Sequence, residues 1–207
     1  MLSFARSCGR RSRAFNSGTR ALRGLFGVLP VPLLFLFGAC EETTPEQAGE
    51  RAAPIIQSLV NESSSLPMDA RLAVGSYMDA QRIRIEMEKA RLPGRLAALR
   101  QRLDSAEVKL ARRSTKYHDS LRGIWDAIRE AEDPNLDGKE RQELSPYLPG
   151  AKATAEGVAA AYDSARKAAD LYLEALRASQ VEKAREYHVR YMETLDRISA
   201  AGRRPKP

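Results

Sequence analysis

The sequence predicts an all-α fold over residues 45–200, an elongated antiparallel bundle of three to four helices. Apolar residues recur at three- and four-residue spacing along the long segments, which places them on one face of an α-helix. Proline and glycine interrupt these segments at only a few places. No sustained two-residue alternation and no Asn-Gly turn indicates a strand or a β-hairpin. Residues 40–207 are long enough for one such domain with its own core.

Two helices separated by a serine-rich linker are expected at the start of this domain. The stretch Thr44-Pro45-Glu46-Gln47 offers a cap residue, a proline at the first helical position and the spacing of a capping box. The first helix then reaches about Val60, and residues 61–65 (NESSS) are expected to form the linker. A second helix is predicted over 67–92, and Pro93-Gly94 ends it.

The third predicted helix has the clearest apolar stripe. Its seam is not a strict heptad, because Arg113 and Ser120 occupy positions that should be apolar and the stripe moves to Leu121 and Ile128. A straight helix drifts in this way against a 3.5-residue repeat, so a bundle of fairly straight helices is favoured over a long coiled coil. The stripe comprises Leu96, Leu99, Leu103, Ala106, Leu110, Tyr117, Leu121, Ile124, Ile128 and Ala131.

The remaining chain is expected to form a connection, one long helix and a tail. Residues 133–150 are punctuated by proline and glycine, with a short helix over 139–144. The last helix is predicted from about 151 to 199, about 70 Å long if unbroken at roughly 1.5 Å per residue. Its row of tyrosines is expected to lie in the core or to line an apolar groove. Residues 201–207 are expected to be a basic, disordered tail.

Residues 1–39 have the features of a signal peptide. Six arginines and no acidic residue precede an uncharged run of sixteen residues, Gly24 to Ala39. A bilayer-spanning helix needs roughly 20 apolar residues, and Pro30 and Pro32 make such a helix still less favourable. A positive segment followed by a short apolar segment predicts export and removal of this leader.

The residues at the end of this run resemble the lipobox of bacterial lipoproteins. The match is Phe37-Gly38-Ala39-Cys40, with Phe37 where that family usually has leucine, and it covers only the first 40 or so residues. The resemblance implies cleavage between Ala39 and Cys40, a diacylglyceryl group on the Cys40 thiol, and acylation of the new amine. It further implies a tether over 40–44 and a lipid-anchored, periplasm-facing place in the cell envelope. In lipoproteins of enteric bacteria an aspartate after the cysteine commonly retains the protein in the inner membrane. Because Glu41 stands there instead, the resemblance favours the outer membrane.

Three alternatives for the leader stay open. The arginine- and serine-rich, acid-free residues 1–23 also fit a mitochondrial transit peptide, which leaves the apolar run and the Gly-Ala-Cys sequence without a reason. The pair Arg10-Arg11 also occurs in twin-arginine export signals. Translation that starts downstream of Met1 would leave the mature chain unchanged.

The net charge of +7 does not indicate nucleic-acid binding. Without the six leader arginines, the 34 basic residues fall to 28, against 27 acidic residues. The mature surface is therefore expected to be of mixed charge, and no nucleic-acid partner is predicted. Cys8 leaves with the leader, so Cys40 alone cannot form an internal disulfide and the fold must be held by packing.

One loop resembles the first half of an EF-hand calcium loop. Residues 133–138 (DPNLDG) place Asp133, Asn135 and Asp137 at the first three ligand positions. The twelfth position, which should be a bidentate glutamate, is Leu144. The second interpretation is that Asp137 caps the next helix and Glu140 completes a capping box. Weak calcium binding at most is therefore expected.

No other residue set indicates catalysis. A nucleophile elbow, a phosphate-binding glycine loop and zinc-ligand spacing are missing from the sequence. His118 and His188 lack the Glu-x-x-His spacing of metal sites in helical bundles. The sequence therefore predicts no enzyme and no cofactor beyond the lipid on Cys40. The expected function is a membrane-anchored helical binding or structural module with an envelope protein partner; the alternative is a small-ligand or calcium-binding sensor.

Overall fold

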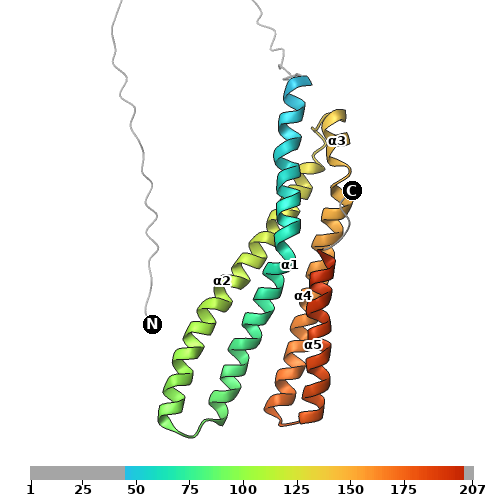
Figure 1. The fold of residues 1–207 in the computed structure, drawn as a ribbon. Helices are drawn as coiled ribbons and strands as arrows, with labels where there is room; N and C mark the ends of the chain where they lie inside the picture. Colours follow the sequence, from blue (N-terminus) through green and yellow to red (C-terminus); the bar gives the residue numbers. More distant parts are fainter. Residues whose placement is uncertain (1–44, 203–207) are drawn as a thin grey trace, which may run out of the picture. The chain divides into compact units, whose positions relative to one another are not determined.

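A computed structural model describes residues 45–202, which form five helices and no strand (Figure 1). The all-α prediction is confirmed. The predicted signal peptide, the tether and residues 203–207 of the tail lie outside the described residues. The helices are α1 (Pro45–Lys89), α2 (Pro93–Ala131), α3 (Gly138–Leu144), α4 (Leu148–Arg177) and α5 (Val181–Ala201).

The four long helices form two antiparallel hairpins. α1 and α2 are joined by a short turn at residues 90–92, and α4 and α5 by a turn at 178–180 (Figure 1). The short helix α3 follows α2 and, like α2, α4 and α5, it packs against α1. Helix α1 is thus the element that contacts all the others within the described chain, and its faces decide how the two hairpins fit together.

The predicted linker at 61–65 is wrong, because α1 continues through it without a break. The Ser64 hydroxyl donates to the carbonyl of Val60 at 2.7 Å, one turn back, so the serine is accommodated inside the helix. Leu59 and Leu66 on either side are 1% and 0% exposed. Serine in a helix costs about 0.5 kcal/mol per residue relative to alanine, and the burial of these two leucines outweighs this cost. The two helices predicted over 45–60 and 67–92 are therefore one.

The prediction of one continuous last helix over 151–199 is wrong, because this part of the chain forms two helices, α4 and α5, joined in a hairpin. Ser179 has a φ of 57°, in the left-handed region. The N–H of Gln180 donates to the carbonyl of Ala175 at 2.9 Å, and that of Ser179 to Leu176 at 3.2 Å. This pair of bonds is the Schellman motif that ends helices, usually with glycine at the left-handed position. Because serine stands there instead, the sequence carries no stop signal.

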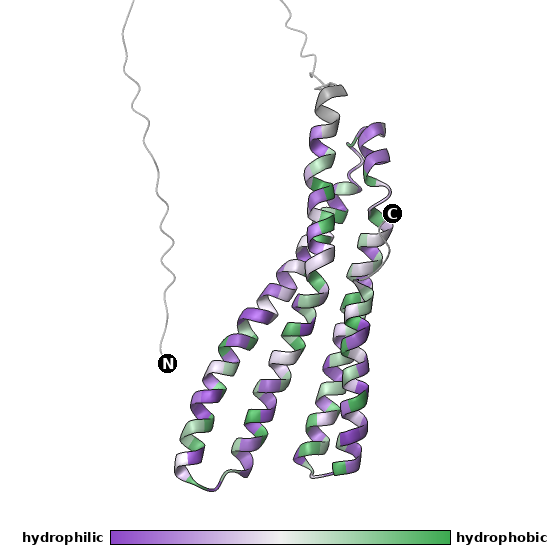
Figure 2. Cartoon of the chain, in the orientation of Figure 1, coloured by the Kyte–Doolittle hydropathy of each residue, from purple (hydrophilic) through white to green (hydrophobic). Residues whose placement is uncertain are grey.

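The apolar residues divide into two clusters. The main core takes side chains from all five helices, including Leu66 of α1, Ile124 of α2, Leu144 of α3, Val158 of α4 and Ile198 of α5. The second, which we call the tip cluster, lies near the turn between α1 and α2 and uses those two helices alone. It contains Ala80, Ile83, Leu99 and Ala106. Figure 2 shows the polar character of much of the α2 surface toward this turn.

Two polar contacts cross the α1–α2 interface. Asp69, 3% exposed, accepts a hydrogen bond from the Ser120 hydroxyl at 3.0 Å and lies 2.9 Å from the Lys116 ammonium group. Seven residues closer to the α1–α2 turn on each helix, the Arg113 guanidinium donates to the Ser76 hydroxyl at 2.8 Å. The predicted shift of the stripe is thus wrong at Ser120, which stays in the interface because Asp69 supplies an acceptor. Paired polar residues at such positions can fix helix register.

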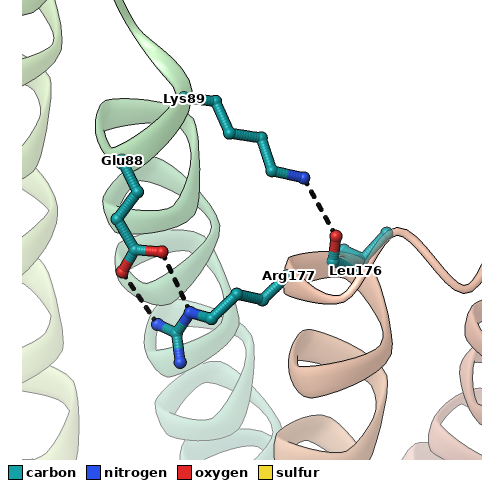
Figure 3. A network of polar contacts seen from close by, with 4 residues as sticks. All are labelled: Glu88, Lys89, Leu176 and Arg177. Carbon is teal, nitrogen blue, oxygen red and sulfur yellow. Dashed lines mark hydrogen bonds and ion pairs between the residues drawn. The ribbon is translucent and has the colours of Figure 1, made fainter.

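The far end of α1 is tied to the end of α4 by polar contacts (Figure 3). Arg177 and Glu88 form a bidentate ion pair, and both N···O distances are 3.0 Å. The Lys89 ammonium donates to the carbonyl of Leu176 at 3.0 Å, where the last turn of α4 leaves carbonyl groups without helical partners. Because these side chains are about half-exposed, each contact contributes roughly 0–1 kcal/mol.

Candidate functional site

A long hollow follows the face of α1 that lies between α2 and α5. We call it the α1 groove. Its walls are α1 from Ser64 to Arg82 and α5 from His188 to Ser199, with Gly202 after α5, Arg113 of α2 and Tyr172 of α4. Its volume is about 770 Å³. This volume is within the range of roughly 300–1,000 Å³ that is common for binding sites.

The lining of the α1 groove includes apolar side chains that face solvent. Met68 is 60% exposed, Met192 is 40% exposed and Leu72 is 36% exposed. At Gly75 an added Cβ would meet no atom within 4 Å, so the floor is open at that point. Methionine is flexible and polarizable, and it is common on surfaces that adapt to a partner. The groove therefore offers apolar area to a ligand.

Three arginines surround this apolar area. The Arg71 guanidinium donates to the Ser199 hydroxyl at 2.8 Å, and Arg113 donates to Ser76. Within residues 45–202 none of Arg71, Arg82 and Arg113 forms an ion pair with a carboxylate. Many arginines elsewhere on the surface are paired, as in Arg177 with Glu88. The groove thus combines exposed apolar groups with positive charge that the described chain does not neutralise.

A second hollow of about 660 Å³ continues from the α1 groove toward the tip cluster. The two share Asp79 and Arg82, and the second lies between α1 and α2. Arg102 and Lys109 add positive charge, while Glu86 adds negative charge and lies 3.6 Å from Arg102. Along the whole path, five basic side chains stand against two acidic ones.

The tyrosines of the predicted row divide between the core and the groove. Tyr162 stacks on Tyr117 of α2 with ring centroids 4.1 Å apart, and burial raises the pKa of Tyr117. Tyr172 lines the α1 groove, and Tyr191 belongs to the main core and also lines this groove. Burial also raises the pKa of Tyr191; the nearby Asp79 carboxylate adds to this rise, and Arg71 opposes it. Both outcomes foreseen for the row therefore occur.

The residues of the calcium-like loop are engaged in local structure. Asp133 accepts hydrogen bonds from the backbone and the side-chain amide of Asn135, both at 2.9 Å. Asp137 accepts from the Glu140 N–H at 2.7 Å, and its own N–H donates to Glu140 at 3.0 Å, so the predicted capping box is confirmed. Leu144, at the position of the missing ligand, is fully buried.

The structure therefore brings Asp133 and Asn135 together in a turn and directs Asp137 to the start of α3. Among residues 45–202 no cluster of three or more His, Cys, Asp or Glu side chains is arranged to hold a metal ion. The two histidines lie in different helices, His118 near the Tyr117 ring and His188 on the α1 groove. The predicted lipidation site, Cys40, and the cleavage residue Ala39 lie outside the described residues.

Sequence reasoning missed the α1 groove. In the sequence Arg113 stands out only as an interruption of an apolar stripe, and no pattern singles out Arg71 or Arg82. The signal available was the recurrence of Met68, Leu72 and Gly75 on one face of α1 beside these arginines. It could not be used without knowing that α5 runs alongside.

Comparison with known protein families, with curated proteins and with solved structures finds nothing that matches this chain. Within the part of the chain that the structure describes, no helix combines the length and the apolar character needed to cross a bilayer. The function must therefore be argued from the lipobox-like sequence and from the α1 groove.

Proposed function

We propose that this chain is a lipid-anchored protein of the cell envelope that acts, without enzymatic activity, as a helical binding module. The anchor is the acylated Cys40, by the lipobox resemblance. The binding surface is the α1 groove. The single observation that carries the binding role is the exposed apolar lining of this groove beside three arginines that no carboxylate of the described chain neutralises.

The chemistry of such an anchor fits a permanent association. Each buried methylene contributes about 0.8 kcal/mol, and one acyl chain holds a protein only marginally while two or more hold it firmly. The described helices, residues 45–202, carry the main core and the tip cluster among themselves.

The anchor is tested by metabolic labelling with a fatty acid. The full chain should incorporate label, and Cys40→Ala should incorporate none. Cys8→Ala, which removes the only other cysteine, is the matched control and should label like the wild type. Equal labelling of wild type and Cys40→Ala would refute the anchor.

The binding role is tested by site-specific cross-linking in intact cells. A photoreactive residue at Leu72, on the α1 groove, should yield a discrete cross-linked product. The same residue at Leu171 is the control, because Leu171 is 43% exposed, similar to the 36% of Leu72, and lines none of the hollows described above. A product at both positions, or at neither, would count against the groove as the binding surface.

The alternative, a calcium sensor, has one observation in its favour. Glu140 is 1% exposed, and its Oε1 atom has no hydrogen-bond partner among the described residues. One oxygen each of Asp133, Asp137 and Glu140 is engaged in the turn and the cap, and the bidentate ligand is replaced by Leu144. We therefore predict the same melting temperature in calcium and in chelator, and no calorimetric binding at micromolar calcium. A saturable signal that Asp133→Ala and Asp137→Ala abolish would favour the sensor.

A further inference from the structure

We propose that the α1 groove binds an acidic amphipathic helix of a partner protein. The inference rests on the proposed function, since it names the kind of partner that the binding module takes. It follows from three properties of the groove: its charge, its length and the arrangement of its exposed apolar side chains.

The charge of the groove selects an acidic partner. Arg71, Arg82 and Arg113 face the α1 groove against Asp79 alone, and Arg102 and Lys109 extend the positive charge along the adjoining hollow. A glutamate-rich face placed here would pair with guanidinium groups, which bind carboxylates through two parallel hydrogen bonds. A basic partner would meet like charges, which disfavours its binding.

The length and walls of the groove select a helix. From Ser64 to Glu86 the two hollows follow α1 for about 33 Å at roughly 1.5 Å per residue, the length of a helix of about 20 residues. Met68 and Leu72 are one turn apart on α1, and Met192 faces the same hollow from α5. An apolar helix face fits such a groove between helices. Strand addition needs a sheet edge, and residues 45–202 contain no strand.

The same charges disfavour the most available competitor, a second copy of this chain. In a two-fold symmetric dimer that pairs α1 groove with α1 groove, the same patch meets itself. Arg71, Arg82 and Arg113 of one copy would then approach those of the other. The exposed Met68 and Met192 would be covered only at the cost of bringing like charges together.

The test uses methyl-labelled methionine in residues 41–207, because the described helices of this part carry both apolar clusters. Met68, Met78 and Met192 line the α1 groove, while Met87 packs on the tip cluster and serves as an internal control. The probe is a designed helical peptide of about 20 residues with leucine on one face and glutamate beside it. Two matched peptides carry lysine in place of glutamate, or the same residues in an order that destroys the apolar face.

The glutamate peptide should shift the Met68 and Met192 methyl signals saturably and leave Met87 unchanged. Arg82→Glu should weaken binding by about tenfold or more, because a charge that attracted the peptide then repels it. Arg95→Glu is the matched control: Arg95 lies exposed on α2 and lines neither hollow. Met68→Ser, at a 60% exposed position that the fold tolerates, should also weaken binding.

Four results would overturn the inference. In the first, the lysine or the scrambled peptide binds as well as the glutamate peptide. In the second, Arg82→Glu and Met68→Ser leave binding of the glutamate peptide unchanged. In the third, the methyl signals of the groove move with protein concentration alone, which indicates self-association, and in the fourth, vesicles with anionic phospholipid move these signals while the glutamate peptide does not. If Leu72 cross-links in cells but the glutamate peptide fails, the binding module stands and this partner falls. If Leu72 gives no product, the module itself falls.

Discussion

The main core and the tip cluster are built from the same helix, α1, by different means. Around the main core, α1 is packed by α2, α3, α4 and α5, and side chains such as Leu66, Ile124 and Ile198 are fully buried. In the tip cluster α1 meets α2 alone, over small residues such as Ala80 and Ala106. Leu92 and Val108 of this part are about 70% exposed.

Helix α1 therefore contributes unevenly to stability along its length. Stability per residue depends on how much apolar surface is removed from water, and a two-helix contact removes less than a four-helix core. The polar contacts of Asp69 and Ser76 join α1 to α2, and the α1 groove follows the same stretch of α1. The proposed binding surface thus runs beside the well-packed part of α1, which carries Leu66, Val74 and Met78 of the main core.

The largest effect is expected from Ile124→Ala in the main core. Ile124 is 0% exposed, and the cavity left by truncation cannot close because α1 and α4 hold its walls. We expect a loss of about 3–4 kcal/mol in the free energy of unfolding, measured by urea denaturation. A loss as small as that of an exposed-site control such as Val189→Ala would show that the main core is not the stabilising region.

A smaller effect is expected from Leu99→Ala in the tip cluster, although Leu99 is only 3% exposed. The two-helix tip can collapse around the gap or open locally, so the global loss should be about 1–2 kcal/mol. Hydrogen exchange should show faster opening of residues 93–106 than of 117–131 in the wild type, and Leu99→Ala should accelerate only the former. Uniform exchange along α2 would erase the distinction between the two regions.

The turns of the two hairpins differ as well, and Ser179→Gly tests that difference. The α1–α2 turn carries Pro93 at the first position of α2, a favoured place for proline, whereas Ser179 holds a left-handed conformation that costs an L-residue about 1 kcal/mol. Glycine adopts it without strain. We expect Ser179→Gly to raise the free energy of unfolding by roughly 0.5–1 kcal/mol, in thermal melts. Destabilisation by this change would mean that the serine is not strained.

The smallest effect is expected at the polar tie between the ends of α1 and α4. A double-mutant cycle with Glu88→Gln and Arg177→Gln should give a coupling of about 0.5–1 kcal/mol, because both side chains are half-exposed. The coupling should shrink in 1 M salt, where the screening length is about 3 Å. Coupling above about 2 kcal/mol would show that the tip depends on this ion pair rather than on its apolar cluster.

Local pattern determined much of the fold. The spacing of the apolar residues placed Leu99, Ile124 and Ile198 on buried faces, because side chains three and four apart share one side of a helix. Pro45 and Pro93 marked the starts of α1 and α2 through their fixed φ. The capping box at Asp137 was legible for the same reason, since both of its partners lie within one turn.

Tertiary structure decided what depends on distant partners. Residues 61–65 are helical because Leu59 and Leu66 are buried by other helices, and Ser120 is interior because Asp69 reaches it from α1. The turn at Ser179 was hidden, since the apolar stripe continues across it and only the packing of α5 on α4 makes the reversal favourable. The α1 groove exists for the same reason: its walls on α1 and α5 come from segments more than 100 residues apart, and only the fold brings them to one surface.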